Sequence, residues 1–115
     1  MANTNVLRQA GQTVGLSVTA SSHASTTIAA YTNDQVNFTS FLNTSTNPVA
    51  IKMSSVNPCP AAVFPTDSTP GDFVLPASMQ TPIVLASPAA PYYMTAIALV
   101  SGPSLIYATP VNDQS

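Results

Sequence analysis

Charged side chains are the residues that this sequence most lacks. Only 5% of its 115 residues are charged, two of them basic and four acidic, against roughly 25% in an average soluble domain. There is no glutamate and no tryptophan, and the basic residues are Arg8 and Lys52. Proteins bind nucleic acids and anionic membranes mainly through lysine and arginine, so the composition excludes both partners. No apolar run approaches the roughly 18 residues that a transmembrane helix needs.

Residues that carry catalytic or metal-binding chemistry are equally scarce. The single histidine, His23, lies in a short polar turn, and no G-x-S-x-G motif accompanies it. The single cysteine, Cys59, has no cation nearby in sequence that would activate it; it cannot form an internal disulfide, which fits a reducing compartment. Asp67 and Asp72 share a loop, but the acidic residues show neither zinc nor calcium-loop spacing. We therefore expect no catalytic residue, no cofactor and no metal site.

The N-terminal residues 1–11 read as an arm. They contain Val6 and Leu7 but show no strand alternation, and no apolar segment follows a positive charge as it would in a secretory signal. A terminal segment of this kind is ordered only when something holds it. We expect Val6 and Leu7 to contact a neighbouring subunit, and we expect synthesis in a cytoplasm.

The rest of the chain, residues 12–115, favours β-structure. Threonine, valine, isoleucine and tyrosine recur, helix formers are rare, and eleven prolines separate the apolar runs. A Pro-rich loop is expected at residues 55–72. The pattern predicts one all-β domain of about eight short antiparallel strands, a β-sandwich or jelly roll, with an immunoglobulin-like sandwich or a small barrel as alternatives. The predicted strands are residues 13–20, 26–31, 35–42, 49–53, 73–75, 83–86, 92–100 and 105–111.

The predicted strand 92–100 is apolar on both faces. An antiparallel strand with one face in water should alternate apolar and polar residues, so its second face is expected to be covered. It is covered either by another subunit or, if the strand lies centrally in the sandwich or under a loop, by the chain itself. In the subunit reading Ile97 and Leu99 point into the core. The interface residues on the opposite face are then Tyr92, Met94, Ala96 and Ala98.

A series of strand-and-turn motifs runs through residues 35–111. The motifs, in order, are Val36-Asn-Phe38, Asn47-Pro-Val49 leading into Ile51, Asp72-Phe-Val-Leu-Pro76, Thr81-Pro-Ile-Val-Leu85, Tyr92-Tyr-Met-Thr-Ala-Ile-Ala98 and Leu105-Ile-Tyr-Ala-Thr-Pro110. This series resembles the capsid decoration or cement proteins of tailed bacteriophages, which are small virion proteins with a jelly-roll-like sandwich. The Pro-rich segment 57–70 is longer than the family's pattern. The resemblance implies a homo-dimer or homo-trimer that binds the major capsid protein and clamps neighbouring capsomers.

These observations favour a structural role over an enzymatic one. We expect a non-enzymatic virion protein on the capsid surface, made in the host cytoplasm. The alternative is another virion component, such as a head–tail adaptor, a tail protein or a fibre protein, including one that binds carbohydrate. A small enzyme is disfavoured because one histidine and no glutamate leave few groups for acid–base catalysis.

Overall fold

The computed structural model describes residues 7–21, 23–29, 38–88, 92–100 and 104–113. This part of the chain forms nine strands and no helix, so the predicted all-β class is confirmed. Among these residues no helix is long and apolar enough to cross a membrane. The strands are β1 (Leu7–Gln9), β2 (Val14–Val18), β3 (Thr26–Ile28), β4 (Phe38–Asn43), β5 (Val49–Ser54), β6 (Phe73–Leu75), β7 (Ile83–Ala86), β8 (Tyr92–Ala98) and β9 (Ser104–Asp113).

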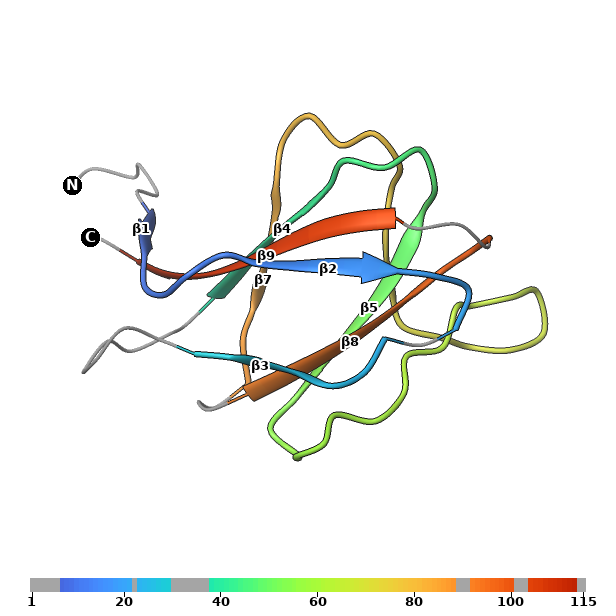
Figure 1. The fold of residues 1–115 in the computed structure, drawn as a ribbon, viewed down its shortest axis with the longest axis horizontal. Coiled ribbons are helices and arrows are strands. Elements are labelled where there is room, and N and C mark those ends of the chain that lie inside the picture. Colours follow the sequence, from blue (N-terminus) through green and yellow to red (C-terminus); the bar gives the residue numbers. More distant parts are fainter. Residues whose placement is uncertain (1–6, 22, 30–37, 89–91, 101–103, 114–115) are drawn as a thin grey trace.

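The strands form two antiparallel sheets (Figure 1). One sheet has the order β1-β9-β4-β7, and β2 also pairs with β9; the other has the order β3-β8-β5-β6. The pairing is nested, because β2 pairs with β9, β3 with β8, β4 with β7 and β5 with β6. This is the path of one long hairpin folded over into two sheets. The described strands therefore have the jelly-roll topology that the sequence predicts.

The core lies between the two sheets. In each strand alternate side chains point inward, and the inward set is almost entirely apolar. Burying each large aliphatic or aromatic side chain stabilises the fold by about 1.5–3 kcal/mol. The largest fully buried apolar side chains are Tyr92, Phe41, Leu16, Ile28, Leu75, Met94, Ile106, Val18 and Val49.

The described part of the N-terminal arm belongs to this sandwich, so the expected contact with a neighbouring subunit is wrong for residues 7–11. β1 pairs with β9 of the same chain from Leu7 opposite Asp113 to Gln9 opposite Val111. The next residue, Ala10, is fully buried and donates a hydrogen bond to the carbonyl of Pro110 at 2.8 Å. The reason is that β9 is ten residues long and β2 pairs only with its first half. β1 fills the remaining edge; Val6 lies outside the described residues.

Candidate interaction surface

The described residues contain no group of three or more His, Cys, Asp or Glu side chains that would hold a metal ion. His23 is half-buried beside the edge of β8, where its backbone N–H donates to the Ala96 carbonyl at 2.7 Å. Its Nδ1 lies 2.8 Å from the Ala24 carbonyl oxygen. These contacts hold residues 23–25 against the sheet. Cys59 is 5% exposed and is a small buried side chain.

The Pro-rich loop between β5 and β6 covers the outer face of β8. Thr95, in the middle of that face, is 2% exposed and donates from its hydroxyl to the Pro60 carbonyl at 2.8 Å. Cys59 and Ala62 of the loop are buried, and the Cys59 N–H donates to the Ser25 hydroxyl at 2.9 Å. The second face of the strand is therefore covered by the chain's own loop, one of the two alternatives left open by the sequence.

The orientation predicted for β8 is wrong. The four predicted interface residues point into the core, whereas Leu99, which was assigned to the core, is 55% exposed. Alternation cannot tell the two faces apart when both are apolar, and nothing in the sequence indicated that the loop folds back over one of them. The four corrected residues and their exposed fractions are Tyr92 (0%), Met94 (0%), Ala96 (0%) and Ala98 (2%).

A hydroxyl cluster explains how Tyr92 can be buried whole. Its phenol hydrogen-bonds with Thr39 of β4, and Ser87 lies 2.6 Å from the Thr39 hydroxyl and 3.3 Å from the Tyr92 hydroxyl. A buried hydroxyl without a partner is costly. Because Tyr92 and Thr39 belong to different sheets, the cluster also ties the two sheets together.

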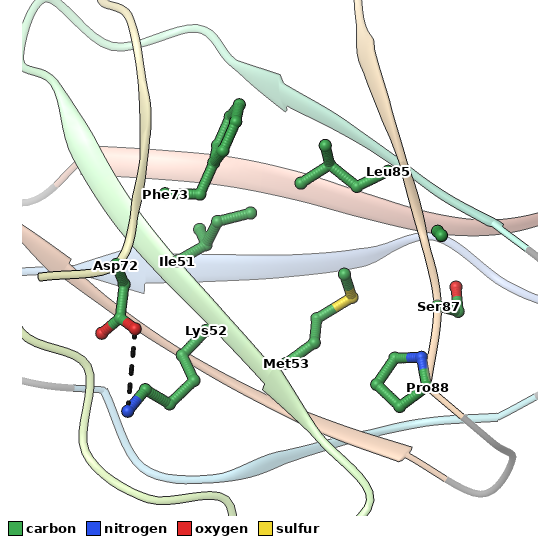
Figure 2. Close-up of a pocket in the computed structure, with 9 residues that line it drawn as sticks. Ile51, Lys52, Met53, Asp72, Phe73, Leu85, Ser87 and Pro88 are labelled. Carbon is green, nitrogen blue, oxygen red and sulfur yellow. Dashed lines mark ion pairs between the residues drawn. The ribbon is translucent and has the colours of Figure 1, made fainter.

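A pocket of about 320 Å³ opens at the edge of the sandwich where β5 and β6 face β7 (Figure 2). Its lining is mostly apolar, with one ion pair between Lys52 and Asp72 at 3.6 Å. The second carboxylate oxygen of Asp72 accepts the Val63 N–H at 2.7 Å, so this side chain anchors the loop. The pocket does not join a nucleophile to a base. Its lining residues are Ile51, Lys52, Met53, Asp72, Phe73, Leu85, Ala86, Ser87 and Pro88.

The sheet that contains β2, β9, β4 and β7 has an outer face of a different character. Phe41, Ile106 and Leu16 point into the core, so their neighbours along each strand point outward. The registers place Leu42 opposite Tyr107 and Ser17 opposite Leu105 on this outer side. We call the following set the uncharged face: Gly15 and Ser17 of β2, Leu105, Tyr107 and Thr109 of β9, Ser40 and Leu42 of β4, and Val84 of β7.

The uncharged face is unusual for a sheet surface in water. β2, β4 and β7 contain no charged residue, and the one charged residue of β9 is Asp113 at its end. Leu105 and Val84 are 41% and 38% exposed. The sequence contains a sign of this apolar outer face, because the predicted strand 105–111 has apolar residues at successive positions. The predicted strand 92–100 has the same pattern more strongly. An antiparallel sheet with one wet face is expected to be polar on that side, so this face has the chemistry of a protein contact.

Comparison of the chain with models of protein families, with curated proteins and with solved structures found no match.

Proposed function

We propose that this chain is a structural, non-enzymatic virion protein that decorates the outer capsid shell and stabilises contacts between capsomers. The observation that carries the proposal is the uncharged face, an open sheet surface of apolar and hydroxyl side chains. Two of its large apolar residues, Leu105 and Val84, are 41% and 38% exposed. Such side chains gain free energy when another protein removes them from water.

The chemistry of the whole chain supports a permanent association. A net charge of −2 over 115 residues gives weak repulsion between copies, which is unfavourable for a protein that must stay dispersed. It is favourable for a protein packed against neighbours, because hydroxyl and apolar groups are buried without the desolvation penalty of ions.

The fold and the sequence motifs support the virion setting. Jelly rolls recur in viral capsid proteins, although they also occur in lectins and cupins, and a fold by itself does not define a function. The resemblance of residues 35–111 to bacteriophage decoration proteins adds the specific role. The major capsid protein is the proposed partner.

The experiment is quantitative mass spectrometry of purified particles from the cells that make this protein. A decoration role requires copy numbers comparable to that of the major capsid protein. A density map of the same particles should then show the protein spread over the shell. A few copies confined to one vertex or to the tail would indicate the adaptor, tail or fibre role instead. Absence from the particles would contradict the proposal.

A further inference from the structure

We infer that the uncharged face binds the same face of a second copy of this chain, so that two copies pair sheet to sheet. The inference rests on the proposed function, because it names the partner of the surface that carries that proposal. In this arrangement copies seated on neighbouring capsomers pair with each other, and a different part of the domain contacts the shell.

Charge complementarity is the first argument. A partner that brings a charged side chain to the uncharged face buries that charge without a counter-ion, which is strongly unfavourable. The partner surface must therefore be free of charge over the whole contact. The same face on a second copy meets this requirement, because it consists of the same uncharged residues. A two-fold axis generates such a self-complementary contact.

The packing of side chains around Gly15 is compatible with a second copy as the partner. Gly15 has no side chain and lies between Tyr107 and Leu105, whose side-chain carbons come within 3.6 and 3.7 Å of where its Cβ would be. These two side chains therefore lie over the glycine at van der Waals distance from its backbone position. They form a continuous apolar surface there that a two-fold-related copy can contact with the same residues.

The size of the face limits the area that the contact can bury. β2, β4, β7 and β9 together contain 25 residues, and each strand residue occupies about 3.4 by 4.8 Å of a sheet. The flat area is thus about 400 Å² per copy and about 800 Å² per pair, which is the size of a weak interface. We expect a dimer with a dissociation constant in the micromolar to millimolar range. On a shell, where copies are held side by side, the effective concentration raises the occupancy of such a contact.

The other sheet does not offer an equivalent surface. The loop between β5 and β6 covers β8, where Thr95 is 2% exposed. Lys52 of β5 lies opposite Thr95 and forms an ion pair with Asp72, so this sheet also carries charge. Among the described sheet faces, the uncharged face is the one that is both open and free of charge.

The test is sedimentation velocity of the purified full chain from about 10 µM to 1 mM, the range set by the expected affinity. Two variants, Val84→Lys and Leu105→Lys, each place a charge on a different strand of the face. The matched control is Val63→Lys, because Val63 is an exposed valine of the Pro-rich loop with a similar exposed fraction (42% against 38% for Val84). Circular dichroism verifies that each variant is folded.

We expect the wild type and Val63→Lys to dimerise and both face variants to dimerise at least about a hundredfold more weakly, because each buries an unpaired charge. A wild type that stays monomeric at 1 mM, or folded face variants that dimerise normally, overturns the inference. A parallel particle-binding assay separates the two proposals. If the wild type is monomeric and the face variants lose attachment, the face binds the shell, and the proposed function stands without the dimer. A dimer that forms through this face but binds no particle supports the inference and contradicts the proposed function.

Discussion

At the scale of single residues, Asn43 does more to shape one end of the sandwich than any charged group. Its side chain is fully buried and donates to the carbonyls of Asn47 at 2.8 Å and Pro76 at 3.1 Å. Its oxygen accepts the Ser45 N–H at 3.1 Å and the Ser45 hydroxyl at 2.7 Å. One amide thus joins the turn after β4 to the turn after β6.

The first prediction follows from these bonds. Asn43→Ala leaves the Pro76 carbonyl and the Ser45 N–H without their partner, while the Asn47 carbonyl keeps the Ser45 hydroxyl. We expect the substitution to lower the free energy of unfolding by about 2–4 kcal/mol. Urea unfolding followed by circular dichroism measures the loss. The control is Asn47→Ala in the same turn, whose side chain makes one long bond to Ser104 at 3.4 Å; we expect it to cost less than about 1 kcal/mol. Equal losses in the two variants would contradict the organising role of Asn43.

The corrected orientation of β8 gives a second prediction at this scale. Ala98 is 2% exposed and Leu99 is 55% exposed. The same substitution should therefore destabilise the domain strongly at Ala98 and only slightly at Leu99. We expect Ala98→Asp to lose at least about 3 kcal/mol or fail to fold, because an unpaired charge enters the core. Leu99→Asp should change the free energy of unfolding by less than about 1 kcal/mol. A stable Ala98→Asp domain would restore the orientation that the sequence suggested.

At the scale of elements, β1 is the strand that the sequence pattern does not predict. Its three residues carry no alternation that could identify them, and their strand conformation depends on a free edge of β9, more than a hundred residues later in the chain. Gly11 marks the point where the arm crosses the sandwich, since a Cβ there would collide with the Ala29 carbonyl. Such a constraint is visible only once the edge strand is known.

Removal of β1 is the third prediction. Deleting residues 1–9 takes away the pairing with residues 111–113, and we expect the isolated domain to lose about 1–3 kcal/mol, since each backbone hydrogen bond contributes about 1 kcal/mol net. The matched control deletes only residues 1–6 and keeps β1, so the difference between the two truncations measures the strand itself. Thermal unfolding of both proteins provides the comparison. No difference between them would favour an arm that acts on another subunit.

The remaining strands were largely predictable, and their exceptions have physical causes. The predicted strands 73–75 and 83–86 coincide with β6 and β7, because prolines and turn residues bound them on both sides. The predicted strand 105–111 is longer in the structure, running to Asp113 because β1 pairs with its end. Which sheet face is open was not predictable, since it depends on where the Pro-rich loop packs. The sequence therefore indicated an apolar second face on strand 105–111, but not that this face would stay open.

At the scale of the whole molecule, the scarcity of charge governs how the protein responds to its solvent. Six charged residues in 115 leave few attractions or repulsions for salt to screen. The contacts that hold the fold are apolar and hydroxyl in character, as the core and the Thr39, Ser87 and Tyr92 cluster illustrate. If the proposed function is correct, the contacts between the protein and the particle share this chemistry.

The fourth prediction therefore concerns ionic strength. Between 0.05 and 1 M sodium chloride the screening length falls severalfold, to about 3 Å, and ion pairs at a protein surface weaken accordingly. We expect most of the protein to stay on the particle across this range, because hydroxyl, amide and apolar contacts are little affected by screening. Pelleting the particles at each salt concentration and measuring the bound fraction gives the result, and urea at low salt serves as the control that releases apolar contacts. Release of most of the protein by salt alone would mean that the few charged groups, Arg8 and Lys52 foremost, hold it in place. Attachment would then be electrostatic, and hydroxyl, amide and apolar contacts would not explain it.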